Sequence, residues 1–264
     1  MVSLKKWAAA AAASCALVAG SLAPAGAQES VASLESGGAT PTIIGGSVAT
    51  SPWVVQLRYN QAGMVGVRTC TGQQLDSRWI LTAKHCVAGS YNMHVYHSNS
   101  VTNPGAATTA ARLYSAPTGD IALIRLDAPV QLRSYASLNM NYRPGFGQAG
   151  TIMGYGNGAW SSPTNHLRSA AVRVNGTNVD LYGGAAAQVN GVTGAANHGD
   201  SGGPLIVGGR VVGVCSKGDT NDPGANINAG SQYALLNQAS AWIQRTTGLN
   251  FAGTFSDGRD TQLN

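Results

Sequence analysis

From about Ile43 onward, the sequence consists of short apolar segments separated by Gly, Asn and Ser. Frequent turn residues between short apolar segments are typical of an all-β sandwich or barrel. The exception is 234–247, where Leu236, Ala239 and Ile243 are spaced as on one face of a helix. The sequence therefore predicts an all-β fold with one helix near the C-terminus. The expected strands are 53–59, 79–83, 121–126, 150–153, 171–174, 204–207 and 210–214.

Composition excludes several other classes of protein. Charged residues are 10% of the 264 residues, against about 25% in typical domains, which excludes coiled coils and charge-rich tails. The 16 Lys and Arg give a net charge of +5 but form no basic run, so we expect no nucleic-acid partner. No segment after residue 27 has the roughly 18 apolar residues of a membrane span.

The N-terminus has the features of a secretory signal. Lys5 and Lys6 precede an apolar run at 7–20, and the small residues at 25–27 match a signal peptidase site. We expect 1–27 to be removed on secretion, 28–42 to be a propeptide, and 248–264 to be a C-terminal tail. The mature chain then keeps Cys70, Cys86 and Cys215, which allow one disulfide and leave one spare cysteine.

The segment 199–204, Gly-Asp-Ser-Gly-Gly-Pro, is the strongest indication of chemistry. Glycines beside Ser201 would let backbone N–H groups approach a reacting carbonyl oxygen, although the same segment could be a Gly-rich turn. A serine nucleophile needs a base. His85 ends an apolar strand beside Cys86, and Asp120 begins another apolar strand, where a charge needs a partner.

The order of these residues discriminates between folds. An α/β-hydrolase needs its His after the nucleophile, and no His follows Ser201. A subtilisin-type order needs an Asp before the His, and Asp76 is the one mature candidate. The order His85, Asp120, Ser201 is that of the chymotrypsin arrangement.

Over 43 to about 247, the chain resembles a secreted chymotrypsin-type serine protease, with an Ala-rich signal that suggests a bacterial source. The resemblance rests on Ile-Ile-Gly-Gly at 43–46, Cys70 to Cys86, 120–126, Gly-Tyr-Gly at 154–156, the serine segment and Trp-Ile-Gln at 242–244. It implies two six-stranded antiparallel β-barrels with a C-terminal helix and a boundary near 140–150. His85 and Asp120 would come from the first barrel and Ser201 from the second.

The resemblance also implies roles for individual residues. His85, Asp120 and Ser201 would form a catalytic triad that acts through an acyl-enzyme, with Gly199 and Ser201 N–H groups as the oxyanion hole. A Cys70–Cys86 disulfide would stabilise the fold by about 3 kcal/mol. In a zymogen activated after Thr42, the new ammonium of Ile43 would pair with Asp200. No metal or other cofactor is implied.

Positions around the expected specificity pocket depart from trypsin. Ala195 occupies the position of the pocket Asp, so an uncharged side chain is expected on the substrate residue before the cleaved bond (P1), although Asp219 lies near the rim. Asn197 replaces a cysteine of a family disulfide, and Lys217 replaces a tryptophan. The expected substrate-binding residues are Ala195, Ala196, Ser216, Lys217, Gly218 and Ser231.

The expected partners are protein or peptide substrates and a proteinaceous inhibitor, with the enzyme itself a monomer. Two alternatives remain at this point. A non-catalytic binding protein can share this fold, since fold does not fix function, and an esterase can use the same nucleophile.

Overall fold

The computed structural model of the chain describes residues 43–251. The expected signal peptide at 1–27, the expected propeptide at 28–42 and the end of the expected tail at 252–264 lie outside the described residues.

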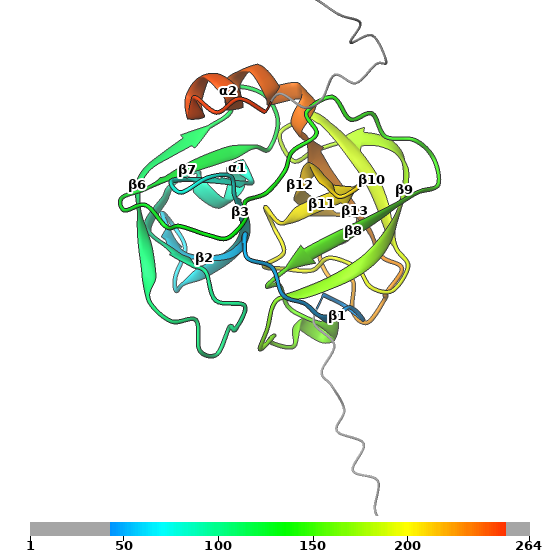
Figure 1. Ribbon diagram of the computed structural model, residues 1–264. Coiled ribbons are helices and arrows are strands. Elements are labelled where there is room, and N and C mark those ends of the chain that lie inside the picture. The colour runs from blue at the N-terminus through cyan, green and yellow to red at the C-terminus, as the bar shows by residue number, and fades with distance from the viewer. Residues whose placement is uncertain (1–42, 252–264) are drawn as a thin grey trace, which may run out of the picture. The chain divides into compact units, whose positions relative to one another are not determined.

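The first half of the described chain forms a closed antiparallel barrel (Figure 1). Its strands follow the order β2-β3-β4-β7-β6-β5, and β5 pairs with β2 to close it. Its interior is apolar, with Leu57, Ile80 and Ile124 fully buried. The bounds are β2 (Val54–Gln61), β3 (Arg68–Gln74), β4 (Trp79–Thr82), β5 (Ser90–Tyr96), β6 (Ala107–Ser115) and β7 (Ala122–Leu126), with a single helical turn, α1 (Lys84–Val87), after β4.

The second half forms another antiparallel barrel, in which β8 pairs with both β11 and β9. Ile152, Val189 and Leu205 fill its interior. A short strand, β1 (Ser47–Val48), pairs with β9 outside the closed ring. The bounds are β8 (Gln148–Gly154), β9 (Arg168–Val179), β10 (Ala185–Gly191), β11 (Pro204–Val207), β12 (Arg210–Gly218) and β13 (Gly230–Leu235). A short 3-10 turn, η1 (Ala159–Ser161), precedes β9. The prediction of two six-stranded β-barrels is confirmed.

A third apolar cluster lies between the barrels and includes residues of both, such as Leu123 and Val214. The C-terminal helix α2 (Ser240–Thr247) adds Ile243 to this cluster, and it lies over the first barrel although it follows the second in sequence (Figure 1). Gly248, in the left-handed conformation, ends the helix by donating its N–H to the Gln244 carbonyl.

The expected helix at 234–247 is wrong in its first part. Ala234 and Leu235 belong to β13, and 236–239 form a 3-10 turn, η2 (Leu236–Ala239). β13 lies between β10 and β12 and pairs with both. Pairing on two sides overrides the helical spacing of these apolar residues.

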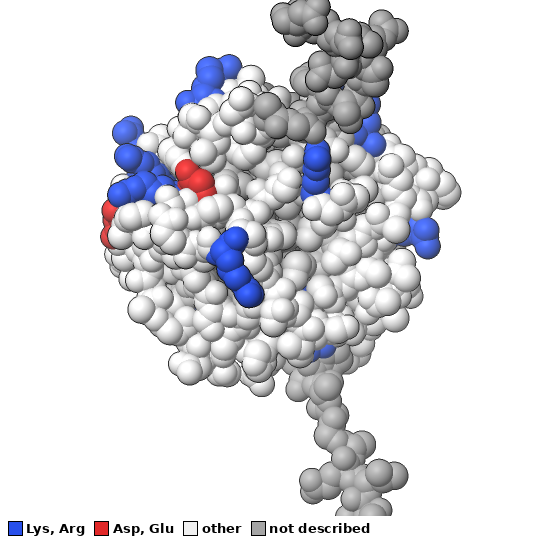
Figure 2. All heavy atoms as spheres, in the orientation of Figure 1, with Lys and Arg blue, Asp and Glu red and all other residues white. Residues whose placement is uncertain are grey.

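Charged side chains are sparse on the surface that Figure 2 shows. Lys and Arg lie at several separate places, and most of this face is formed by uncharged residues. Within residues 43–251, no helix is long and apolar enough to cross a membrane.

Candidate active site

A disulfide fixes the turn that carries His85. Cys86, next to His85 in α1, is bonded to Cys70 of β3, with 6.3 Å between the two Cα atoms. The structure therefore contains the disulfide that the resemblance implies, and Cys215 is free and buried. Sulfur atoms of both cysteines lie near His85, but they are bonded to each other and cannot serve as metal ligands.

Asp120 is fully buried and accepts hydrogen bonds on both carboxylate oxygens. Its Oδ2 lies 2.7 Å from His85 Nδ1 and accepts a second hydrogen bond from the Ser216 hydroxyl, at 2.7 Å. Its Oδ1 accepts the backbone N–H of His85 at 2.9 Å. Three donors surround the carboxylate, so its plane and the imidazole ring are fixed relative to each other.

Ser201 lies in the loop between β10 and β11, and β3 of the first barrel supports this loop. The backbone N–H of Thr71 donates to the Ser201 carbonyl at 2.8 Å, and the Thr71 hydroxyl donates to the Gly199 carbonyl at 3.0 Å. Gln73, also in β3, donates its side-chain N–H to the Gly202 carbonyl. The backbone around Ser201 is thus held by the barrel that carries His85.

The N–H groups of Gly199 and Ser201 have no acceptor among the described residues. The carbonyl of His198 accepts the Asn157 N–H at 2.7 Å. Because a trans peptide is planar, this bond also fixes the direction of the Gly199 N–H. Gly199 has a φ of +96° and lies against Gly156, where a Cβ would come within 2.9 Å of the Gly156 Cα. Only glycine fits this backbone.

His85 and Ser201 line the same cavity, of about 490 Å³. Within residues 43–251 no hydrogen bond joins the Ser201 hydroxyl to the His85 ring. Catalytic hydrogen bonds are often long in unliganded enzymes and shorten when substrate binds. Ser201 and His198 also line a second cavity of about 290 Å³, so the two hollows meet at the serine.

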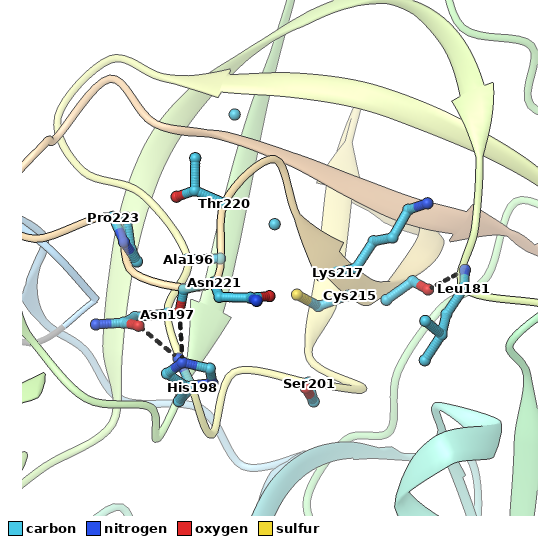
Figure 3. A pocket seen from close by; sticks show the side chains of 13 residues that line it. Leu181, Ala196, Asn197, His198, Ser201, Cys215, Lys217, Thr220, Asn221 and Pro223 are labelled. Carbon is cyan, nitrogen blue, oxygen red and sulfur yellow. Dashed lines mark hydrogen bonds between the residues drawn. The ribbon is translucent and has the colours of Figure 1, made fainter.

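The second cavity brings together four of the six expected substrate-binding residues, namely Ala196, Ser216, Lys217 and Gly218 (Figure 3). Ala195 and Ser231 are buried and are not among the residues that line it. Sequence reasoning did not assign Leu181, His198 or Cys215 to the pocket. Leu181 lies in the turn between β9 and β10, where no motif marks the pocket. His198 precedes Gly199, and Cys215 of β12 precedes Ser216, so their positions next to expected site residues were the available signal.

A hydrogen bond joins two residues that line this pocket. The ring Nε2 of His198 lies 2.7 Å from the Asn221 carbonyl oxygen (Figure 3). Asn197 donates its side-chain N–H to the Gly158 carbonyl at 2.8 Å. These bonds connect loops at the position where the family disulfide is missing.

Asp219, near the pocket rim, has neutral partners. Its carboxylate accepts hydrogen bonds from the side-chain amides of Gln188, at 3.3 and 3.2 Å, and of Gln232. No Asp or Glu is among the residues that line the pocket.

Asp200, next to the serine, is fully buried. Its Oδ1 accepts the Gly156 N–H at 2.8 Å and its Oδ2 accepts the Asn197 N–H at 2.9 Å. Among residues 43–251, no Lys, Arg or His forms a salt bridge with it. Burial raises the pKa of Asp200 to about 7, against the opposing effect of the two N–H donors. Ile43 packs in the core of the same barrel.

Comparison with known proteins decides the family. The family model described as Trypsin matches residues 43–243. The chain belongs to the trypsin family. It is therefore a serine peptidase, a hydrolase of the class that acts on protein or peptide substrates.

Relatives of this trypsin-family chain come from several kinds of organism. Trypsin delta of Drosophila erecta is 30% identical and covers 77% of this chain and 87% of its own. An alpha-fibrinogenase-like protein of Daboia siamensis is 29% identical and covers 74% of this chain and 83% of its own. An uncharacterized peptidase of Corynebacterium glutamicum is 27% identical, with coverages of 78% and 72%.

Two solved structures share the fold. Neuropsin, a serine protease expressed in the limbic system of mouse brain, is 25% identical, with a TM-score of 0.63 over 76% of this chain and 98% of its own. HL collagenase, at 22% identity, has a TM-score of 0.66 over 78% and 99%. Its likeness concerns the fold alone.

Proposed function

We propose that the chain is a secreted serine endopeptidase in which Ser201, His85 and Asp120 form the catalytic triad. The observation that carries this proposal is the His85–Asp120 contact beside a cavity that His85 shares with Ser201. Ser201 attacks the peptide carbonyl, and His85 accepts its proton and then donates it to the leaving amine. Asp120 keeps the proton on Nδ1 of His85 and stabilises the imidazolium. Water then hydrolyses the acyl-enzyme.

The free N–H groups of Gly199 and Ser201 are the proposed oxyanion hole. They are oriented before substrate arrives. The His198 carbonyl, in the same peptide as the Gly199 N–H, accepts the Asn157 N–H. The Asp200 carbonyl, in the same peptide as the Ser201 N–H, accepts the Gly203 N–H. Donors that need no reorganisation stabilise the charge that develops on the carbonyl oxygen.

The experiment that tests this function is fluorophosphonate labelling of the secreted protein, followed by peptide mapping in a mass spectrometer. We expect a chain that begins at Ile43 and carries the label on Ser201. A chain that begins at Ile43 and takes no label would favour a non-catalytic binding protein. Faster hydrolysis of esters with negligible hydrolysis of matched peptide amides would favour an esterase.

Two features support activation by cleavage after Thr42. Ile43 has a φ of +39°, which is unfavourable for a β-branched residue inside a chain. A new N-terminus has no preceding carbonyl and does not carry this strain. Asp200 is buried without a cation in the described chain, and the Ile43 ammonium is the proposed partner. Residues 28–42 would then keep the enzyme a zymogen.

Cleavage after Thr42 should stabilise the chain more at pH 7 than at pH 4. A carboxyl whose pKa is raised to about 7 in the uncleaved chain stays protonated when folded, but ionises near 4 when unfolded. The stability of the precursor is therefore full below about pH 4 and falls as the pH rises toward 7, by about 4 kcal/mol at 1.4 kcal/mol per unit. An ammonium partner removes this loss.

Urea unfolding at both pH values measures the effect, with Ser201→Ala in every chain to prevent self-digestion. The precursor, the chain that begins at Ile43 and an Asp200→Asn precursor are compared. The free energy of unfolding of the Asp200→Asn precursor should lack the extra pH dependence. Equal pH dependence of the two precursors would contradict the role of Asp200.

A peptide with Leu at P1 should be hydrolysed with a kcat/KM at least about 100-fold higher than its Lys counterpart. No carboxylate lines the pocket. The nearby Asp219 carboxylate accepts hydrogen bonds from the side-chain amides of Gln188 and Gln232. A buried ammonium without a partner is costly. Equal hydrolysis of the Lys peptide would contradict this explanation of the pocket. Asp219 would then be the nearest candidate to bind the Lys ammonium, and Asp219→Asn should abolish hydrolysis of the Lys peptide.

The setting of the enzyme is also part of the proposal. The signal-like residues 1–27 support secretion, and the Ala-rich signal together with the Corynebacterium glutamicum relative supports a bacterial source. Scattered Lys and Arg, without a basic run, support the absence of a nucleic-acid partner. A monomer without a membrane partner is proposed from the likeness to the family. A proteinaceous inhibitor that fills the cleft as a substrate does is the remaining proposed partner.

A further inference from the structure

A second buried carboxylate lies against the backbone of Asp120. Asp180, 2% exposed, lies in the turn between β9 and β10. Its Oδ2 accepts the N–H of Asp120 at 2.9 Å and a side-chain N–H of Gln238 at 3.3 Å. Its Oδ1 accepts the N–H groups of Tyr182 and Gly184, both at 2.9 Å. A carboxylate has about four lone-pair sites, so every acceptor position of Asp180 is used.

The contact between this turn and the Asp120 segment is close-packed. A Cβ on Gly184 would come within 2.6 Å of the Gly119 Cα and 2.7 Å of the Asp180 Oδ2. Gly119 has a φ of +71°, and a Cβ there would come within 2.6 Å of the Gln238 side chain. Two glycines thus allow the barrels to approach closely beside the candidate triad.

The same turn also contacts the side chain of Asp120 through a neighbour. The N–H of Leu181, next to Asp180, donates to the Ser216 hydroxyl oxygen at 3.0 Å (Figure 3). That hydroxyl donates in turn to Asp120 Oδ2. The second barrel therefore holds Asp120 at two points, its backbone N–H and its carboxylate, and adjacent residues of one turn supply both contacts.

We propose that Asp180 is a positioning residue for the triad, which fixes the Asp120 backbone so that its carboxylate faces His85 Nδ1. This inference rests on the proposed function. Asp180 acts through Asp120 and does not touch the substrate. A small displacement of a catalytic group can lower the rate by about 10²-fold, which sets the scale of the effect.

The test is a double-mutant cycle of Asp180→Asn and Asp120→Asn, with kcat and KM measured on one peptide substrate. An asparagine at 180 keeps the size but replaces one carboxylate oxygen, which accepts two N–H groups, by an NH₂ group, so two of the four donors lose their acceptor. We expect kcat to fall about 10- to 100-fold with KM within about threefold of wild type. In the Asp120→Asn background, the same change should alter kcat by less than about threefold.

A control and a second variant complete the cycle. Asp127→Asn removes an exposed carboxylate at the end of β7 and should leave kcat unchanged. Asp180→Ser has a smaller side chain, which leaves room for water to accept the turn N–H groups, so this variant should fold. It should show the same coupling to Asp120→Asn as Asp180→Asn does.

Three outcomes would overturn the proposal. Both Asp180 variants could keep kcat within about threefold of wild type, which would show that the contact is not needed. Equal losses in both Asp120 backgrounds would show a general structural role. If Asp120→Asn alone kept full activity, the proposed triad itself would be wrong. The Asp120→Asn single variant would show this, whereas the Asp180 variants test the positioning role.

Discussion

Replacing Ser201 by Ala is expected to lower kcat by about 10⁶-fold, the scale seen when the nucleophile of a serine protease is removed. The side chain should matter for chemistry and little for folding. Ser201 is half-buried, and its hydroxyl has no hydrogen-bond partner among residues 43–251. The loop around it is supported through backbone carbonyls, which the substitution leaves in place.

Peptide hydrolysis and fluorophosphonate labelling measure this prediction, and urea unfolding checks the fold. A residual rate about 10³-fold above the uncatalysed reaction should remain, because the oxyanion donors still act. Ser98→Ala, in the loop between β5 and β6, is a matched control and should keep full activity. Labelling that persists in Ser201→Ala would show that another residue is the nucleophile.

Much of the strand content could be predicted because apolar runs mark strands that contribute to the barrel cores. The expected segment 204–207 matches β11, and 79–83 exceeds β4 by one residue. β3 was not predicted, since its sequence contains Thr71, Gln73 and Gln74 in place of apolar residues. These side chains are nevertheless fully buried. Their partners are backbone carbonyls of distant loops, which no local pattern reveals.

The residues of the candidate site also fall into those that a local motif predicts and those that only long-range contacts reveal. The types and order of His85, Asp120 and Ser201 pointed to a serine protease, because each belongs to a local motif. Thr71 and Asp180 were missed. Thr71 contacts Gly199, 128 residues away, and Asp180 contacts Asp120, 60 residues away. Such contacts arise only when the two barrels pack together.

Asp120→Asn is the second large effect, an expected loss of about 10⁴-fold in kcat, as for the same change in chymotrypsin-type proteases. Here the geometry also predicts which way the asparagine amide turns. The backbone N–H of His85 donates to Oδ1 and cannot become an acceptor. The asparagine oxygen must therefore take that place, and its NH₂ group must face His85 Nδ1.

An NH₂ group beside Nδ1 can donate only if that nitrogen has no proton. The proton of His85 then lies on Nε2, which can no longer accept the proton of Ser201. The Ser216 hydroxyl oxygen can accept the second N–H of the amide while it keeps the Leu181 N–H, so both amide protons stay paired. We therefore expect a folded enzyme with the wrong histidine tautomer and an unchanged urea midpoint.

Steady-state kinetics at neutral pH measures the loss, and nitrogen NMR of the His85 ring reports the tautomer. Asp127→Asn is again the control, because it removes an exposed carboxylate of the first barrel. A variant that keeps more than about a tenth of kcat would remove Asp120 from the triad. A large loss with the proton still on Nδ1 would mean that the charge of Asp120, and not its control of the tautomer, is what catalysis requires.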